Sequence, residues 1–294
     1  MVDGPQTTDP SNGKIQNSKF ITHNSYPVFV QEGRSRLHYK VYGSGEQVVL
    51  AFHGYGQDHT HFYNIAGVLP HVKIVAFDLF FHGQSVLHKK DTPLQKEFLA
   101  KLIQKLLDEQ QISRFSLMAF SMGGKFALTL LEAFPEKINQ VLLVAPDGIS
   151  TSFWYSVATY PGWLQGLFKR TVVRPARFFK FINWLDNKRL VDPGLIKFAA
   201  WQMNSTQKRL RVYKSWVGFR ALTFDIRKIV KLLNSQNIKF TLFLGEYDQV
   251  ISGQRLQVFA RSITNSELII LKTGHTFLLH EVATYLRRHP GMFS

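Results

Sequence analysis

The stretch from Leu117 to Lys125, which reads Leu-Met-Ala-Phe-Ser-Met-Gly-Gly-Lys, decides the fold of this chain. A short apolar run ends at Ser121, and small residues then open a segment with helical spacing. This is the form of a nucleophile elbow, a strained strand-to-helix turn that presents a serine hydroxyl for attack. The residues two before and two after the serine must be small, and here they are Ala119 and Gly123. Glycine is usual at the first of these positions, so Ala119 is a departure. Taken alone, Ser121 is also compatible with a simple helix N-cap.

Strand and helix patterns alternate on both sides of this turn. Short apolar runs predict strands at 28–31, 37–42, 48–52, 74–77, 115–120, 141–145, 240–244 and 268–271. Helical spacing predicts helices at 94–110, 125–134, 253–262 and 277–288. The first two strands are expected to be antiparallel, and the later ones to be buried and parallel. Such alternation favours the α/β class, with a mostly parallel, doubly wound sheet that helices cover on both faces.

One segment interrupts the alternation and holds most of the charge. The chain of 294 residues has a formal net charge of +16, and residues 148–235 contain 16 Lys and Arg against 3 Asp. All five tryptophans lie in the same segment, which has helical spacing broken by prolines. We therefore expect a disordered tail at 1–24, a core formed by 25–147 and 236–294, and a basic, aromatic helical lid at 148–235.

Composition narrows the class of protein further. The chain has no cysteine, which excludes a disulfide framework and a thiolate metal site. The first twenty residues are polar and lack the apolar region of a signal peptide. No apolar run approaches the length of a membrane-spanning helix. We expect a cytoplasmic protein, with peripheral contact to a membrane as an alternative.

Around Ser121, four further pieces resemble the α/β-hydrolase superfamily with a lid inserted after the sixth strand. They stand in the expected order, and the resemblance spans about residues 28–289. The pieces are Phe52 to Gln57, Phe77 to Ser85, Leu244 to Val250 and Thr273 to Phe277.

The resemblance assigns roles to residues in these pieces. It implies Ser121 as nucleophile, Asp248 as acid and His275 as base, in the chain order that this fold uses. Asp147, which follows the sixth strand, is the alternative acid. The backbone N–H groups of Tyr55 and Met122 would form the oxyanion hole. No metal and no organic cofactor is implied.

Loop histidines near these positions have a less direct interpretation. The resemblance implies that Asp78 and His82 are structural and lie outside the active site. The His53 imidazole is also expected to be a turn residue, although His53 and Gly54 remain candidates for contact with substrate.

The lid is where the sequence leaves alternatives open. Candidates for substrate binding are Arg174, Arg177, Trp154 and Trp184. One interpretation is a helical subdomain whose charges are solvated, and another is an apolar channel with a cationic rim. A third is a surface that rests on anionic lipid. Nucleic-acid binding is disfavoured, because no recognition motif accompanies the charge.

The leading function is a serine hydrolase that cleaves carboxylic esters with small or medium, apolar or anionic acyl groups through an acyl-enzyme. A second enzyme class is a carbon–carbon hydrolase or lyase, because the Ser121 and His275 motifs also resemble the menaquinone-pathway synthases. In that case Arg174, Arg177 or Arg220 would hold carboxylates. A membrane-surface lysophospholipase-like enzyme is a third alternative, and a non-catalytic receptor or scaffold is a fourth.

Overall fold

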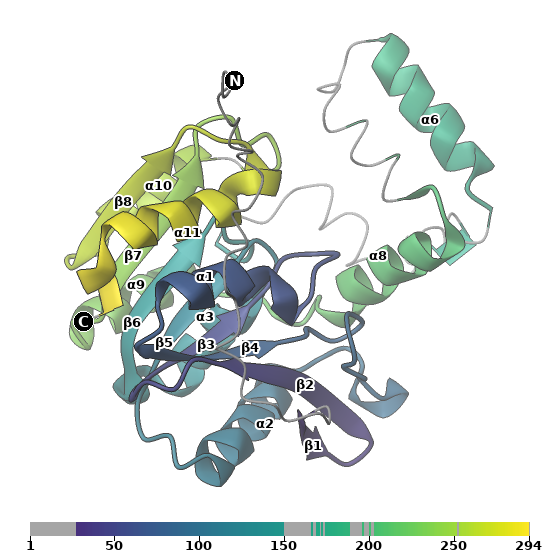
Figure 1. The fold of residues 1–294 in the computed structure, drawn as a ribbon. Coiled ribbons are helices and arrows are strands. Elements are labelled where there is room, and N and C mark those ends of the chain that lie inside the picture. The colour runs from purple at the N-terminus through teal and green to yellow at the C-terminus, as the bar shows by residue number, and fades with distance from the viewer. Residues whose placement is uncertain are drawn as a thin grey trace, which may run out of the picture.

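An eight-stranded sheet forms the centre of the computed structural model, in the order β1-β2-β4-β3-β5-β6-β7-β8 (Figure 1). The structure describes residues 28–149, 174–188, 203–251 and 253–293, and the single positions Gly166, Lys169, Arg170, Val172, Ile196 and Ala200. The strands are β1 (Val28–Glu32), β2 (Ser35–Tyr42), β3 (Gln47–Phe52), β4 (Val72–Phe77), β5 (Phe115–Phe120), β6 (Ile138–Val144), β7 (Lys239–Gly245) and β8 (Ser266–Leu271). β1 and β2 are antiparallel to their neighbours, and the other strands are parallel. The predicted fold class and strands are confirmed.

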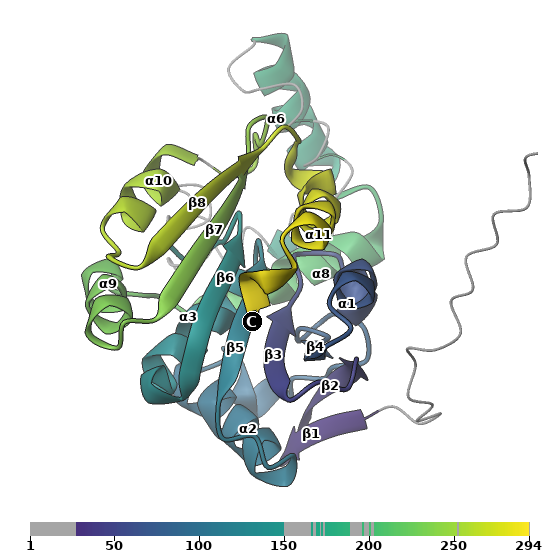
Figure 2. The same ribbon diagram turned by 60° about the vertical axis from the view of Figure 1, so that its left-hand side comes forward.

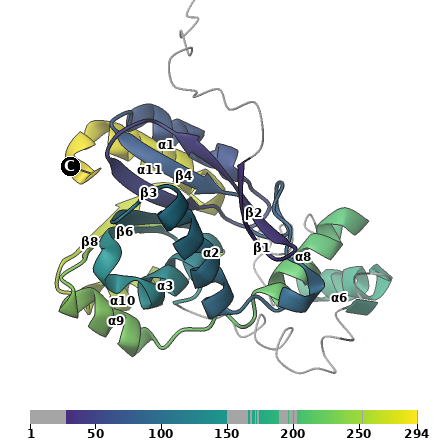
Figure 3. The ribbon, with the colours of Figure 1, turned by 90° about the horizontal axis from the view of Figure 1, so that it is seen from below.

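Helices cover both faces of the sheet (Figures 2 and 3). One face carries α1 (Tyr63–Val68) and α11 (Leu278–Arg288), and the other carries α2 (Lys96–Glu109), α3 (Gly123–Ala133), α9 (Ile226–Ser235) and α10 (Gly253–Arg261). Short 3-10 helices are η1 (His59–Phe62), η2 (Lys89–Asp91), η3 (Pro135–Lys137), η4 (His275–Phe277) and η5 (Pro290–Phe293). The helices expected from the sequence are present, and each of their ends lies within two residues of the predicted end.

The two faces of the sheet contribute to two separate hydrophobic clusters. Along β3, Leu50 and Phe52 belong to the cluster under α2 and α3, while Val49 and Ala51 belong to the cluster under α1 and α11. Side chains of a strand point alternately to the two faces, so a strand covered on both sides is apolar throughout. All six residues of β5 are buried for this reason.

Two helices of the insert are described. α6 (Ala176–Asn187) lies farther from the sheet than α8 (Thr206–Gly218), as Figure 1 shows. α8 is anchored at its end, where the carbonyl of Gly218 accepts a hydrogen bond from Leu94 N at 2.7 Å. A Cβ on Gly218 would lie 2.4 Å from the ring of Phe81, so this helix packs closely on the loop after β4.

α9 lies inside the segment that the sequence assigned to the lid, but it packs with the core helices. Its buried residues Ile229 and Leu233 join the cluster that includes α3. Asp225 caps the helix by accepting hydrogen bonds from Arg227 N and Lys228 N. This packing favours an end of the lid before Ile226, instead of at residue 235.

The order of the strands indicates which end of the sheet is suited to a functional site. From β3 the sheet continues in one direction to β4 and in the other to β5, so the loops after β3 and β5 diverge at a topological switch point. Open α/β sheets bind ligands at the carboxyl ends of strands around such a point. No helix in the described ranges has the length and apolar character needed to cross a bilayer.

Candidate active site

Ser121 stands on a strained turn between β5 and α3. Its φ is +50°, a left-handed conformation that is uncommon for a residue with a side chain. The turn is held by a hydrogen bond from Ser121 N to Val144 O at 2.9 Å. Backbone strain of this kind persists only where the surroundings fix it, and it is concentrated at functional sites.

Small residues around Ser121 are a steric necessity. A Cβ on Gly123 would lie 2.1 Å from Phe52 O, and one on Gly124 would lie 2.5 Å from Asp147 O. The first of these oxygens belongs to the last residue of β3, and the second belongs to the loop after β6. Ala119 is fully buried, and the structure accommodates its methyl group in the core beneath the turn. The departure from glycine at this position is therefore compatible with the turn.

His275 and Asp248 complete a chain of hydrogen bonds from Ser121. The Nε2 atom of His275 lies 3.1 Å from Ser121 Oγ, and its Nδ1 atom lies 2.6 Å from Asp248 Oδ2. A carboxylate only accepts, so Nδ1 carries the proton and Nε2 is left to accept from the serine hydroxyl. The other oxygen of Asp248 accepts hydrogen bonds from Val250 N at 2.8 Å and Ile251 N at 3.0 Å. These bonds fix the carboxylate, and through it the imidazole.

Asp147, the alternative acid, has a different position. Its side chain lies 3.6 Å from Lys125 Nζ and accepts a hydrogen bond from Gly148 N at 2.7 Å. Its own N–H donates to Ser121 O at 2.8 Å. The structure thus places Asp248 at the imidazole, and Asp147 behind the serine turn. The sequence analysis did not identify the buried Lys125 as the partner of Asp147. The sequence feature that could have indicated this is the position of Lys125, four residues after Ser121 on a helix that faces inward.

The two N–H groups expected to form an oxyanion hole belong to Tyr55 and Met122. Tyr55 lies in the loop after β3, and Met122 is the N-cap residue of α3. Within the part of the chain that the structure describes, neither N–H has an acceptor. By contrast, the neighbouring N–H groups of Gly54 and Gly56 donate to Gln57 Oε1 and His82 Nε2. Both expected donors are therefore left for another acceptor.

Two buried histidines join the loops that follow β3 and β4. His53 Nδ1 donates to Gly54 O, and its Nε2 accepts from Leu79 N at 2.9 Å. His82, in the loop after β4, reaches back to the loop after β3: its Nδ1 donates to Phe80 O, and its Nε2 accepts from Gly56 N at 3.0 Å. In each ring both nitrogens form hydrogen bonds with backbone groups, and together the two rings fix the turn that carries the N–H of Tyr55.

Burial keeps this pair neutral. It lowers the pKa of His53 to about 3 and that of His82 to about 4, and the Arg211 cation near His82 lowers the pKa of that ring further. The His53 side chain is completely inaccessible to solvent. This burial favours the interpretation of His53 as a turn residue, and its contact with substrate stays an untested expectation. His82 was expected to be structural, but its bond to Gly56, next to Tyr55, was not foreseen.

Glycine is required at position 54, because a Cβ there would lie 2.8 Å from the ring of Phe120.

The lid candidates have a less direct connection to Ser121. Arg174 and Arg177 are exposed at the start of α6, and Trp184 is half exposed on the same helix. Trp154 lies outside the described residues. The role of these four residues in substrate binding stays a prediction.

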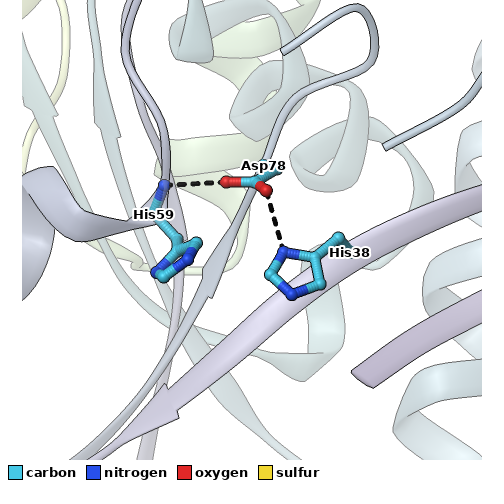
Figure 4. A group of neighbouring side chains, drawn as sticks. All are labelled: His38, His59 and Asp78. Carbon is cyan, nitrogen blue, oxygen red and sulfur yellow. Dashed lines mark hydrogen bonds and ion pairs between the residues drawn. The ribbon is translucent and has the colours of Figure 1, made fainter. Parts of the chain in front are cut away.

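His38, His59 and Asp78 form a polar group beside the loop after β4 (Figure 4). Their potential ligand atoms lie within 4.8 Å of one another, as in a metal site. However, Asp78 Oδ2 accepts from His38 Nδ1 and Gln84 N, both at 2.8 Å, and Oδ1 accepts from His59 N at 2.9 Å. Burial alone would raise the pKa of Asp78, but these hydrogen bonds hold it well below its usual range. The group braces β2, η1 and the loop after β4.

Comparisons with known proteins agree with this architecture. The model of the family described as alpha/beta hydrolase fold matches residues 47–282. Among solved structures, an esterase from Thermogutta terrifontis superposes with a TM-score of 0.66 at 16% identity, covering 91% of this chain and 99% of the other. An enol-lactonase from Burkholderia xenovorans gives a TM-score of 0.60 at 16% identity, covering 90% and 99%. At this identity the superpositions establish the fold.

Proteins with similar sequences include hydrolases and an acetyltransferase component. The uncharacterized hydrolase YugF of Bacillus subtilis is 25% identical over 240 residues, which are 79% of this chain and 84% of that protein. The acetyltransferase component of the acetoin cleaving system of Cupriavidus necator is 32% identical over 114 residues, or 38% of this chain, but the match spans only 30% of that protein. A 2-hydroxy-6-oxononadienedioate/2-hydroxy-6-oxononatrienedioate hydrolase of Comamonas testosteroni is 28% identical over 146 residues, which are 47% of this chain and 48% of that protein.

Proposed function

Because the chain belongs to the alpha/beta hydrolase fold family, we propose that it is a serine hydrolase that cleaves carboxylic esters through an acyl-enzyme. The observation that carries the proposal is the hydrogen-bonded chain from Ser121 through His275 to Asp248, on a turn with a φ of +50°. The nucleophile and its base lie within hydrogen-bond reach, and a third group orients the base.

In the proposed reaction, His275 Nε2 takes the proton of Ser121 as Oγ attacks the ester carbonyl. Asp248 accepts from Nδ1, holds the imidazole in the required tautomer and stabilises its cation. His275 then donates the proton to the departing alcohol, which leaves an ester bond between Ser121 and the acyl group. Water, deprotonated by the same Nε2, attacks this ester, and the carboxylic acid and free Ser121 are formed.

The tetrahedral intermediates carry a negative oxygen. The N–H groups of Tyr55 and Met122 are the proposed donors to it, and Met122 lies at the start of α3, where the helix dipole favours negative charge. His53 and His82 act as positioning residues for this turn, because their bonds to Leu79 N and Gly56 N fix its backbone. The proposed substrates have small or medium, apolar or anionic acyl groups.

A fluorophosphonate probe and a nitrophenyl ester test the proposal together. The wild-type protein should be labelled at Ser121 and should hydrolyse 4-nitrophenyl butyrate, whereas Ser121→Ala should lose the label and about 10⁴-fold or more of the rate. The melting temperatures of the two proteins should be nearly equal, which separates loss of chemistry from loss of fold. Hydrolysis by Ser121→Ala at the wild-type rate would refute the assignment.

A carbon–carbon hydrolase is the second candidate, and the similarity to the Comamonas testosteroni hydrolase favours it. That protein is named for the hydrolysis of dienedioate and trienedioate substrates, which contain a vinylogous ketone and no ester. Incubation with a 2-hydroxy-6-oxo-dienoate, followed by its absorbance, separates the two candidates. Turnover of the dienoate with a kcat/KM far above that of the nitrophenyl ester would favour the second candidate.

A further inference from the structure

α8 carries a cation and a hydroxyl one turn apart on its inward side. Arg211 and Ser215 are spaced i and i+4, which places them on one helix face. Val212, Ser215 and Gly218 on this face are buried, Leu210 on the opposite face is exposed, and Lys214, at the edge of the face three residues after Arg211, is also exposed. Arg211 is partly buried, so its guanidinium lies at the edge of the packed face.

Contacts of α8 show what this face meets. The Oη atom of Tyr55 donates to Lys208 O at 3.4 Å, one turn before Arg211. At the other end of the helix, Gly218 packs on Phe81 in the loop after β4. The inward face of α8 therefore lies beside the loops after β3 and β4, which hold the proposed oxyanion donor Tyr55. Burial raises the pKa of the Tyr55 phenol, and the Arg211 cation opposes this rise, as expected for a charge close to that ring.

Two polar groups on this face lack a partner among the residues that the structure describes. Ser215 is 1% exposed, and its Oγ has no hydrogen-bond partner in the described parts of the chain. No carboxylate pairs with Arg211 within the ranges that the structure describes. Buried hydroxyls are nearly always hydrogen-bonded, so an unpaired one indicates a group still to be supplied.

Arg209, two residues before Arg211, shows what a structural arginine looks like in the same helix. Its guanidinium is buried and donates to Val172 O at 2.8 Å, Met203 O at 2.9 Å and Thr206 Oγ1 at 2.9 Å. Arg209 thus ties together parts of the insert. Arg211 makes no such set of bonds with the described residues, and its planar fork of donors suits a carboxylate.

We propose that Arg211 and Ser215 form a carboxylate subsite that selects esters whose acyl group carries a second, distal carboxylate. The inference rests on the proposed ester hydrolysis at Ser121 and adds the substrate class. Arg211 would bind the carboxylate through two parallel hydrogen bonds, and the Ser215 hydroxyl would donate a third. The cation-rich insert would attract such anions to the site before they bind.

The test compares the monoester of 4-nitrophenol with glutaric acid and the neutral 4-nitrophenyl pentanoate. The ratio of their kcat/KM values, charged over neutral, should exceed one in the wild type and fall about tenfold or more in Arg211→Gln, because a charge-assisted pair is lost. Arg211→Lys should keep part of the ratio, and Ser215→Ala should lower it about threefold. Lys214→Gln, which removes an exposed cation of the same helix, is the matched control and should leave the ratio unchanged. A ratio that is equal in the wild type and Arg211→Gln, or equally lowered in Lys214→Gln, would overturn the proposal.

A second pair of substrates places the carboxylate on the alcohol side, as in 4-(pentanoyloxy)benzoate against phenyl pentanoate. If Arg211→Gln changes this ratio and not the first, the subsite serves the leaving group and the acyl-side proposal is wrong. Binding of glutarate to Ser121→Ala, followed by titration calorimetry, needs no turnover. Binding that disappears in Ser121→Ala/Arg211→Gln would support the subsite even if the esterase proposal failed, and equal binding by both proteins would contradict it.

Discussion

The turn around Ser121 and the helix α8 use their polar groups in opposite ways. In the turn and the loops beside it, side-chain nitrogens and oxygens are engaged in holding the backbone: His53 and His82 bridge two loops, and Asp248 accepts two backbone N–H groups. On the inward face of α8, the hydroxyl of Ser215 has no partner and Arg211 has no paired carboxylate in the described chain.

This difference separates chemistry from selectivity. A site that must hold atoms in one geometry is fixed by saturated hydrogen bonds, since a loosely held base or donor would lose catalytic rate. A site that must recognise a ligand keeps donors in reserve, and their desolvation is compensated only when the ligand binds. Variants in the two regions should therefore fail in different ways.

The largest expected effect distinguishes the two carboxylates near the turn. Asp248→Asn should lower kcat about 10³- to 10⁴-fold, because the amide no longer selects the required tautomer of His275. Asp147→Asn should keep the wild-type rate but lower the urea midpoint, because Lys125 loses a charged partner close to the core. Nitrophenyl ester kinetics and urea denaturation of both variants measure the contrast. The reverse pattern would mean that Asp147 is the acid.

The second prediction concerns the glycines that allow the turn to form. Gly123→Ala should reduce the free energy of unfolding by about 3 kcal/mol, because its Cβ would lie 2.1 Å from the backbone oxygen of Phe52. Gly67→Ala in α1 is the control: no atom lies within 4 Å of the added Cβ, and removing a helical glycine should stabilise by about 0.5–1 kcal/mol. Equal effects of the two substitutions on the urea midpoint would show that the packing around the turn is looser than described.

These two comparisons also show what the sequence could and could not predict. The need for small residues beside Ser121 is local steric chemistry, so it can be read from the chain. The choice between Asp147 and Asp248 is not local in this sense, because both follow strands that end at the same edge of the sheet; the preference for Asp248 came from the resemblance of its loop to the family. The choice depends on which loop reaches His275 in three dimensions.

The surfaces that the helices of the insert cover were harder to predict, because they also depend on the three-dimensional arrangement. Helical spacing in 148–235 correctly indicated helices, but spacing does not say which surface a helix covers. Ile229 and Leu233 give α9 an apolar face like that of a lid helix, yet this face is buried against the core. Ser215 was not singled out, because a lone serine in a helix carries no sequence signal until its buried, unpaired hydroxyl is seen.

The third prediction uses acid to test the histidine bridge between the loops. The pKa values of His53 and His82 in the folded protein, about 3 and about 4, lie below the ordinary value of 6.5. As the pH falls below about 6.5, the unfolded chain binds protons that the folded protein does not, so stability is full above this pH and declines toward pH 4. Each histidine contributes a slope of up to about 1.4 kcal/mol per pH unit in this window.

Urea denaturation between pH 7 and pH 5 measures this slope. His82→Gln keeps an acceptor for Gly56 N but removes one titrating group, so its stability should depend less steeply on pH than that of the wild type. An identical slope in both proteins would mean that His82 is protonated in the folded state. In that case the bridge would not be the neutral, saturated structure that sets this region apart from α8.

The smallest expected effect concerns the strain at Ser121 itself. Alanine keeps the Cβ that disfavours a φ of +50°, whereas glycine adopts this conformation without steric cost. Ser121→Gly should therefore be more stable than Ser121→Ala by about 1 kcal/mol, although both variants lack the nucleophile. Because neither is active, the difference in urea midpoint reports the backbone alone. If Ser121→Gly is the less stable of the two, the turn is not strained, and its rigidity comes from the packing of Gly123 and Gly124 against neighbouring backbone.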